Sequence, residues 1–319
     1  MVRHRRRPGR GHRRRPARAA DPVEQRLVHH RRRLRGGRER VLRRLRRPLP
    51  RVRPLVRLLT VIAPPQRRAL VRAIPDSYAV ALGQVIGAPA IDVARARAQH
   101  VAYRAALEGL GFAVTALPAD EALPDCCFVE DVAIVAAGHG LLTRPGATSR
   151  RAEVEAVAEA LRGAVVLHRT RAPARLDGGD VLRVDDAIFV GQSGRSDGAG
   201  LAAVREVFEP LGFAVRPAPV AAGTLHLKCH VSSPLPGLVL AAEGAYSDAM
   251  FPASTRVVRV PAAEAYAANA VGAGETVLIA AGYPETATRL RAEGLTVVSL
   301  DTSELALADG SLTCLSLLF

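Results

Sequence analysis

Apolar and polar positions alternate with a helical period in several segments of the chain after residue 66. The first segment covers residues 92–110, where apolar side chains recur on one helix face, and it ends at Gly111. A short apolar run over residues 112–117 follows, as expected for a strand. The same order is predicted three more times, with helices over 148–162, 201–211 and 285–293, glycines Gly163, Gly212 and Gly294, and strands over 164–167, 213–215 and 295–300.

A shorter helix is predicted over residues 262–270, and a strand follows it over 276–280. The helical glycines Gly111, Gly163 and Gly212 are 52 and 49 residues apart, a spacing that indicates an internally repeated architecture. Further strands are predicted between the repeated units, over residues 127–135, 180–184, 187–191, 237–241 and 256–260.

These elements predict an α/β fold of roughly five strand–strand–helix–strand modules in one domain over residues 66–319. If the modules surround an axis, their loops converge on one centre, which is a suitable place for a site. A doubly wound parallel sheet is the alternative, but strands that lie between the helices fit it poorly.

Charge divides the chain into two unequal parts. The 319 residues carry 45 Lys+Arg and 30 Asp+Glu, a formal net charge of +15. Residues 1–60 hold 23 of the basic and 3 of the acidic side chains, a net charge of +20, so the remainder has 22 basic and 27 acidic side chains and a net charge of −5. Like charges repel and few apolar side chains are available to pack, so we expect residues 1–60 to be a disordered Arg-rich extension.

This extension has three interpretations. One is a start site assigned too far upstream, in which case a Val codon such as Val61 or Val71 would be the true start, because no Met lies between Met1 and Met250. The others are an inert tail and a nucleic-acid-binding arm. Arms that bind nucleic acid usually mix Lys with Arg, whereas Lys228 is the single lysine of the chain, so nucleic-acid binding is the least favoured of the three.

The cysteines and the apolar runs indicate a cytoplasmic protein with reduced thiols. Cys126, Cys127, Cys229 and Cys314 form no C-x-x-C pair, and the extension lacks the apolar stretch of a secretory signal. No apolar run approaches the roughly 18 residues of a membrane span. C-x-x-C is absent, and the one H-x-x-x-H spacing, His226 and His230, lacks the further ligands at recognisable spacing that a metal needs, so no metal site and no cofactor are expected.

Three carboxylates flank an apolar run at residues 124–131. In an unbroken strand, Asp125 and Asp131 share one face because they are six residues apart, whereas Glu130 and Asp131 face opposite sides. Solvation of a strand edge is the structural alternative.

Two arginines stand at loop positions, Arg150 at the start of a predicted helix and Arg195 at the end of a predicted strand. A cation at a helix N-terminus opposes the helix dipole. A bound anion such as a substrate carboxylate would remove this conflict through a bidentate pair.

Asp177, His226 and Cys314 complete the candidate chemistry. Asp177 precedes a Gly-Gly pair that alone indicates a turn and lacks the spacing of a dinucleotide site. His226 lies in a strand-like alternation, and a buried structural role is the default for it and for Cys314. Together, however, a thiol, an imidazole and an orienting carboxylate are the groups that covalent thiol catalysis needs.

Six motifs in chain order resemble the dimethylarginine dimethylaminohydrolase family, which belongs to the guanidine-modifying, or pentein, superfamily. The resemblance covers about residues 70–319 and implies a five-module ββαβ β/α-propeller (pentein fold) with a central active site. The motifs lie at residues 124–131, 143–151, 176–181, 190–195, 225–228 and 309–314.

The resemblance also implies a role for each candidate residue. Cys314 is the expected nucleophile, His226 the general acid and base, and Asp177 the group that holds the imidazole. Leu315 stands where relatives often have a second Cys, and Ala308 replaces a larger aliphatic residue. The expected substrate-binding residues are Asp125, Glu130, Asp131, Arg150, Arg195 and the lid residue Leu82.

The implied reaction is hydrolysis of an Nω-methylated arginine to citrulline and dimethylamine through a covalent Cys thiouronium intermediate. A small molecule is the expected partner, and a homo-oligomer is allowed. The two arginines favour a substrate with a free carboxylate over agmatine. Two alternatives stay open: another superfamily hydrolase that acts on arginine or a related guanidine, and a nucleic-acid-binding protein that uses the Arg-rich extension.

Overall fold

The computed structural model describes residues 67–319 apart from 84–86, 88 and 221–222. The chain divides into two units, residues 1–62 and 63–319, and the described residues belong to the second. The extension predicted to be disordered over residues 1–60, and the alternative start at Val61, lie outside the described residues.

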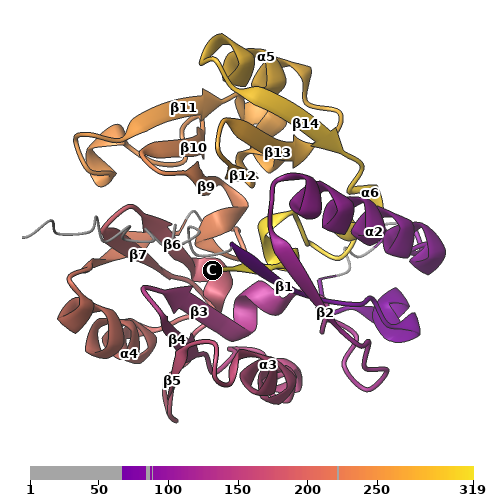
Figure 1. Cartoon of the computed structure of the whole chain (residues 1–319), viewed down its shortest axis with the longest axis vertical. Helices are drawn as coiled ribbons and strands as arrows, with labels where there is room; N and C mark the ends of the chain where they lie inside the picture. The colour runs from indigo at the N-terminus through magenta and orange to yellow at the C-terminus, as the bar shows by residue number, and fades with distance from the viewer. Residues whose placement is uncertain (1–66, 84–86, 88, 221–222) are drawn as a thin grey trace, which may run out of the picture. The chain divides into compact units, whose positions relative to one another are not determined.

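Five three-stranded sheets surround a common centre in this unit (Figure 1). In each sheet the inner strand is antiparallel to the middle strand, and the middle strand is parallel to the outer one. From inner to outer strand, the sheets are β15 (Leu317–Leu318), β1 (Arg68–Arg72) and β2 (Ala113–Leu117); β3 (Ala133–Ala136), β4 (His139–Leu142) and β5 (Val166–Arg169); β6 (Val181–Val184), β7 (Ala187–Gln192) and β8 (Ala214–Pro219); β9 (Val231–Leu235), β10 (Leu238–Ala242) and β11 (Arg256–Val260); β12 (Val271–Ala273), β13 (Thr276–Ala280) and β14 (Thr296–Leu300).

Helices connect the middle and outer strands of four sheets: α2 (Val93–Gly109), α3 (Glu153–Leu161), α4 (Gly198–Phe208) and α5 (Pro284–Ala292). The side chain of Asp92 caps α2 by accepting a hydrogen bond from the Arg95 N–H at 3.0 Å. In the fourth sheet a short 3₁₀ turn, η7 (Asp248–Met250), takes the place of the helix. No helix among the described residues is long and apolar enough to cross a membrane.

The five-module architecture is confirmed, and the four helix–glycine–strand units lie close to where the periodicity predicts them. Two predicted elements differ in type. The helix over 148–162 is split into the 3₁₀ turn η3 (Thr148–Arg150) and α3, and the short helix over 262–270 is the 3₁₀ helix η8 (Ala262–Ala268). Ala-rich sequence supports either helix type, so composition alone does not separate them.

The predicted strand over 127–135 is wrong for its first half. A 3₁₀ turn, η2 (Val129–Val132), precedes strand β3. An apolar run of this length does not distinguish a buried turn from a buried strand, because both exclude water from the same side chains.

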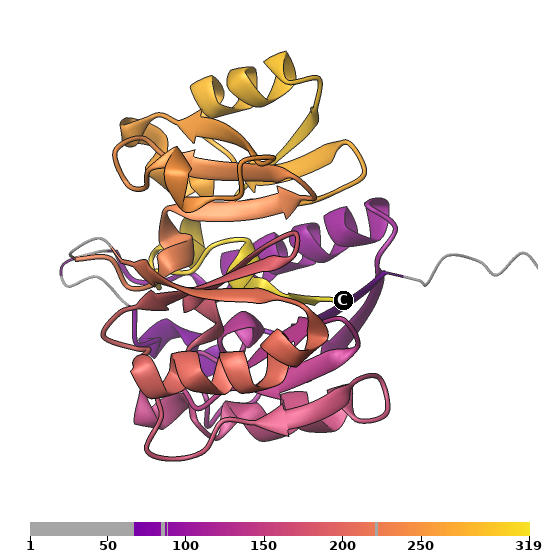
Figure 2. The same ribbon diagram turned by 90° about the vertical axis from the view of Figure 1, so that its left-hand side faces the viewer.

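The first sheet joins the two ends of the domain. Strand β15 pairs with β1, with Leu70 opposite Leu317, and Arg68 and Phe319 exchange backbone hydrogen bonds of 2.6 and 2.9 Å. The C-terminal end lies near the centre of the five sheets in Figure 1, and in the side view of Figure 2 it lies at mid-height toward the right-hand side. The inner strands β3, β6, β9, β12 and β15 line a cavity of about 370 Å³ at the centre of the sheets.

We predict that Leu317→Ala destabilises the domain by about 2–5 kcal/mol, the usual range for a buried Leu in a core. Leu317 is 5% exposed and packs in one apolar cluster with Leu70, Val129 and Val132. Urea unfolding measures the change, with Val101→Ala on the exposed face of α2 as the control, which should alter stability by about 0.5 kcal/mol or less. Equal effects of the two substitutions would contradict the inference that packing of β15 stabilises the domain.

Candidate active site

A cavity of about 140 Å³ gathers most of the residues that the sequence singled out. The residues that line it come from segments that are far apart in the sequence. Its lining consists of Leu82, Gly83, Asp125, Phe128, Asp131, Arg150, Arg195, Leu225, His226, Ala308, Asp309, Gly310 and Cys314. Glu130 and Asp177 are expected site residues that do not line this cavity. Asp177 contacts His226 and Arg195, which do, whereas Glu130 contacts Lys228 and Thr313.

A 3₁₀ segment lies shortly before the inner strand of each module. Because five modules repeat this arrangement, five turns point at one centre. The turns are η2 before β3, η4 (Gly178–Asp180) before β6, η6 (Leu227–Cys229) before β9, η8 before β12 and η9 (Thr313–Leu315) before β15.

Cys314 lies in η9, at the end of the chain that closes the first sheet. Burial raises the pKa of its thiol well above the usual value, and the negative charges of Glu130 and Asp131 raise it further. The thiol is therefore neutral while no cation is bound near it.

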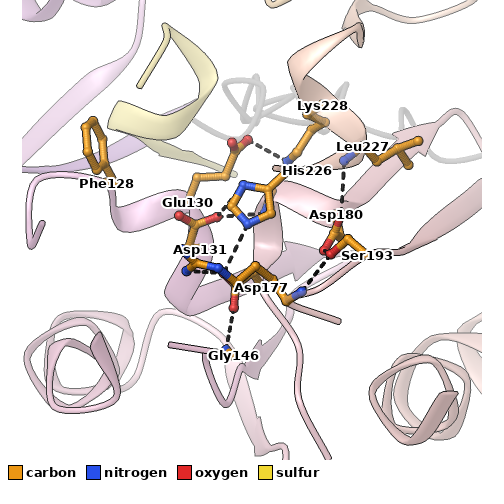
Figure 3. A network of polar contacts seen from close by, with 12 residues as sticks. Phe128, Glu130, Asp131, Gly146, Asp177, Asp180, Ser193, His226, Leu227 and Lys228 are labelled. Atoms are coloured by element: carbon orange, nitrogen blue, oxygen red, sulfur yellow. Dashed lines mark hydrogen bonds and ion pairs between the residues drawn. The ribbon is translucent and has the colours of Figure 1, made fainter. Parts of the chain in front are cut away.

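His226 immediately precedes η6 and lies between two carboxylates (Figure 3). Its Nε2 is 3.0 Å from Asp177 Oδ2, and its Nδ1 is 3.9 Å from Asp131 Oδ1. Burial alone would lower the pKa of His226, but the charge of Asp131 and the hydrogen bond to Asp177 outweigh it and raise the pKa to about 9. The imidazole is thus protonated at neutral pH. The strand predicted here is wrong, since extended backbone at His226 leads straight into a turn.

Asp177 is fully buried and held at several atoms. Its Oδ1 accepts a hydrogen bond from the Gly146 N–H at 2.7 Å, and its own N–H donates to Ser196 Oγ at 3.0 Å. These contacts leave Oδ2 directed at His226, so the expected orienting contact between the two side chains is present. Figure 3 shows both bonds of the carboxylate.

The Gly-Gly pair after Asp177 has a steric function. A Cβ atom on Gly179 would lie 2.6 Å from His226 Nδ1, and one on Gly178 would lie 1.9 Å from the Glu130 carbonyl oxygen. Glycine at these positions therefore allows the backbone to approach the imidazole and the η2 turn closely.

Asp180 is a buried residue that sequence reasoning missed as a site residue. Its Oδ1 accepts from the Leu227 N–H at 2.9 Å, and its Oδ2 accepts from the Ser193 hydroxyl at 2.6 Å. It holds the segment that follows His226 (Figure 3). The available signal was its place in the motif at residues 176–181.

The carboxylates of residues 125–131 are arranged by a turn and not by a strand, so their predicted faces are wrong. Burial would raise the pKa of Asp131, but the charges of His226 and Arg150 outweigh it and lower the pKa to about 2. Asp131 Oδ1 also accepts from the Gly179 N–H at 2.9 Å. Asp125 accepts the Leu82 N–H at 3.1 and 3.3 Å and lines the cavity beside it.

Glu130 is occupied by contacts with the protein itself. Its Oε1 accepts from Lys228 Nζ at 2.5 Å, and its Oε2 accepts from the Thr313 hydroxyl at 2.7 Å (Figure 3). Glu130 and Lys228 line both a recess of about 50 Å³ beside Cys314 and the central cavity of the inner strands. Their ion pair thus lies between these two spaces.

Arg150 and Arg195 differ in how far other groups neutralise them. Arg150 is 5% exposed, and Glu153 accepts from its Nε and Nη2 while Asp131 accepts from its Nη1 at 2.5 Å. The carboxylates of Glu153 and Asp131, rather than a ligand, therefore offset the unfavourable interaction between the Arg150 charge and the helix dipole. Arg195 is 3.6 Å from Asp177 and is the more accessible cation of the pair. Leu82 lies at the rim and is 52% exposed.

Sequence reasoning assigned no role to several residues at the cavity. Phe128 packs against Gly310 so closely that a Cβ atom there would lie 2.3 Å from the ring. Burial raises the pKa of Asp309, while His226 and Arg195 act in the opposite direction. Phe128 and Asp309 both lie within the motifs that carry the family resemblance, which was the signal that could have identified them.

Asp131, Asp177 and His226 could in principle hold a metal ion, because one atom of each lies within 4.8 Å of the others. A ligating imidazole must be neutral. The raised pKa of His226 keeps it protonated, so this arrangement suits a proton donor better than a metal ligand.

Comparisons with known proteins identify relatives of this chain. No family model matches the chain. A dimethylarginine dimethylaminohydrolase of Pseudomonas aeruginosa is 34% identical over 266 residues, which cover 81% of this chain and 98% of that protein. One of Streptomyces coelicolor is 38% identical over 256 residues, covering 79% of this chain and 96% of the relative.

A solved structure shows the same likeness in three dimensions. A variant of the Pseudomonas aeruginosa dimethylarginine dimethylaminohydrolase, complexed with citrulline, matches with a TM-score of 0.73 and 31% identity, over 79% of this chain and 98% of that one. Identity above 30% over nearly the whole length of both relatives shows common ancestry. The chain belongs to the dimethylarginine dimethylaminohydrolase family and has the five-module pentein fold.

Proposed function

We propose that the protein hydrolyses Nω,Nω-dimethylarginine to citrulline and dimethylamine, with Cys314 as nucleophile. The observation that supports this most is that Cys314 and His226 line one cavity, with the imidazole of His226 held by Asp177. Two dimethylarginine dimethylaminohydrolases match 81% and 79% of this chain, and a variant of one has been solved in complex with citrulline.

The groups around the cavity suit a cationic amino-acid substrate. A guanidinium is planar and positively charged, so carboxylates such as Asp125 and Asp131 would hold it through paired hydrogen bonds. Arg195, which lines the cavity, would bind the α-carboxylate of the substrate. Arg150 would also contribute, because its Nη1 carries two hydrogens and Asp131 accepts only one of them. Glu130 would contribute indirectly, because its carboxylate accepts hydrogen bonds from Thr313 and Lys228.

Binding of this cation would activate the nucleophile. In the free protein, burial and the charges of Glu130 and Asp131 keep the Cys314 thiol protonated because they raise its pKa. A guanidinium beside the sulfur adds a positive charge and so lowers the pKa of the thiol. The reactive thiolate therefore forms where substrate is present.

The first step forms a covalent intermediate. The Cys314 sulfur attacks the central guanidinium carbon while its proton passes to solvent. The carbon–nitrogen bond to the dimethylamino group then breaks, and the protonated His226 donates its proton to the departing nitrogen. Dimethylamine leaves, and an S-alkylthiouronium remains on Cys314.

The second step releases the product. His226, now neutral, accepts a proton from a water molecule, and the resulting hydroxide attacks the same carbon. As the carbon–sulfur bond breaks, the added hydroxyl group loses its remaining proton to solvent, so citrulline and the Cys314 thiolate are formed. Asp177 keeps the imidazole in one orientation through both proton transfers.

Three expectations about the surroundings of this reaction stay predictions. They are the cytoplasmic location, a homo-oligomeric state, and the interpretation of residues 1–60, including the nucleic-acid-binding alternative. We retain a small arginine derivative as the binding partner of the described domain.

The substrate distinguishes the proposal from its nearest alternative, an arginine hydrolase of the same superfamily. We expect citrulline release to have the highest kcat/KM with dimethylarginine, followed by monomethylarginine, and a much lower value with arginine. Colorimetric citrulline assays with the three substrates measure this order. Preference for arginine would support the alternative.

We predict that Cys314→Ser lowers kcat by at least about 10⁴-fold while leaving the fold intact, because a serine hydroxyl is not ionised by a nearby cation. Citrulline assays and circular dichroism measure the two properties. Cys126→Ser, which changes a buried thiol outside the cavity, is the matched control and should keep activity. Comparable activity of the Cys314 variant and the control would rule out the nucleophile assignment.

We predict that the imidazole of His226 titrates near pH 9 and that Asp131→Asn moves this titration to lower pH. The variant keeps the burial, which lowers the pKa, but loses the charge that raises it. NMR of ¹⁵N-labelled histidine, with the His226→Gln spectrum for assignment, measures both values. Since the protonated form is the acid, kcat/KM should fall above pH 9 in the unaltered protein. A pKa near 6.5 in the unaltered protein, or one unchanged by the substitution, would contradict this electrostatic account.

A further inference from the structure

The segments that carry His226 and Cys314 belong to different modules and are far apart in sequence. His226 precedes η6 in the fourth module, and Cys314 lies in η9 of the first. No covalent link sets the separation of the two turns, so contacts between side chains and backbone must do so. The fifth module lies between them in chain order, and the sequence assigns no site residue to it.

Asn269 of this fifth module contacts both segments. It directly follows η8, and η8 has the same place in its module as η2, η4, η6 and η9 have in theirs. Its Nδ2 donates to the Lys228 carbonyl oxygen at 3.1 Å and to Thr313 Oγ1 at 2.9 Å. Its Oδ1 accepts from the Thr313 N–H at 2.9 Å. Lys228 is two residues after His226, and Thr313 is the neighbour of Cys314.

These partners fix the orientation of the amide. A backbone N–H can only donate and a backbone carbonyl can only accept, so the Oδ1 and Nδ2 positions of Asn269 cannot be exchanged. The side chain is 2% exposed, and burial makes each unpaired polar atom costly. Ser232 holds the backbone on both sides, through Ala268 O at 2.6 Å and Ala270 N at 3.0 Å.

A second path joins the same two segments. Lys228 Nζ and Thr313 Oγ1 both donate to Glu130, at 2.5 and 2.7 Å. With Asn269 these contacts form a closed loop of hydrogen bonds that joins the segment after η8 to the three turns η2, η6 and η9. A loop of this kind resists displacement of any one member, because moving it breaks bonds with two others.

We propose that Asn269 is a positioning residue that sets the separation and orientation of the His226 and Cys314 segments. This inference rests on the proposed function, in which the two side chains act on one substrate carbon. The predicted substrate-binding residues Asp125, Arg150 and Arg195 lie on other segments. Loss of the amide should therefore slow the chemical steps more than it weakens substrate binding.

Two variants test the contact at different severity. Asn269→Ala removes all three hydrogen bonds, and Asn269→Asp keeps the shape and one acceptor but places a carboxylate oxygen against the Lys228 carbonyl. We expect kcat for dimethylarginine to fall by about 10²-fold in each, the scale of a misplacement of about 1 Å, with little change in KM. The aspartate variant, having the native shape, serves if the alanine variant does not fold.

Thr286→Val is the matched control. Thr286 is a 1% exposed threonine of α5 whose hydroxyl donates to Glu264 at 2.6 Å, and Thr286→Val removes a partly buried hydrogen bond between two residues that do not line the cavity. Its kcat and KM should match those of the unaltered protein even if its melting temperature falls. Equal kcat in the control and both Asn269 variants would overturn the inference.

The partner residue supplies a second test. Thr313→Ser keeps the hydroxyl and should retain kcat, whereas Thr313→Val should lower it. If Asn269 and Thr313 act as one link, the double variant Asn269→Ala/Thr313→Val should lose less kcat than the product of the two single losses, because both changes remove the same bond between Asn269 Nδ2 and Thr313 Oγ1. Fully multiplicative losses, or a rise in KM parallel to the fall in kcat, would overturn the inference. An unaltered protein that releases no citrulline would overturn the proposed function and this inference with it.

Discussion

The balance of buried charge around His226 is the constraint on which the rest of the site depends. Isolated charges are costly in a protein interior, so each must have a partner. Here the partners form a row of alternating sign that starts in α3 and crosses the cavity wall, so that Asp131 and Asp177 each lie between two cations. The row consists of Glu153, Arg150, Asp131, His226, Asp177 and Arg195, with contacts of 2.7, 2.5, 3.9, 3.0 and 3.6 Å.

The propeller makes this row possible because it brings turns of different modules to one centre. Asp131 comes from the second module, Asp177 from the third and His226 from the fourth, each beside an inner strand. Cys314 enters from the last residues of the domain, which pair with its first strand. The pairing of β15 with β1 therefore closes the first sheet and also positions Cys314.

Much of the fold and most of the site could be predicted from the sequence. Repeated glycine-terminated helices reveal the modules, and the motifs identify Cys314, His226 and Asp177. Periodicity failed at residues 127–132 and at 226–229, where buried apolar turns resemble strands. Nor could a pattern show that Glu130 is bound by Lys228 or Arg150 by Glu153, because these partners depend on tertiary distance.

The covalent intermediate on Cys314 is the central claim. Rapid acid quenching during the first turnover with dimethylarginine, followed by mass spectrometry of proteolytic peptides, tests it most directly. The account predicts a transient adduct on the peptide that contains Cys314, with the mass of the substrate less dimethylamine. Citrulline formed in the first turnover without any adduct on that peptide, at quench times shorter than the turnover itself, would contradict it.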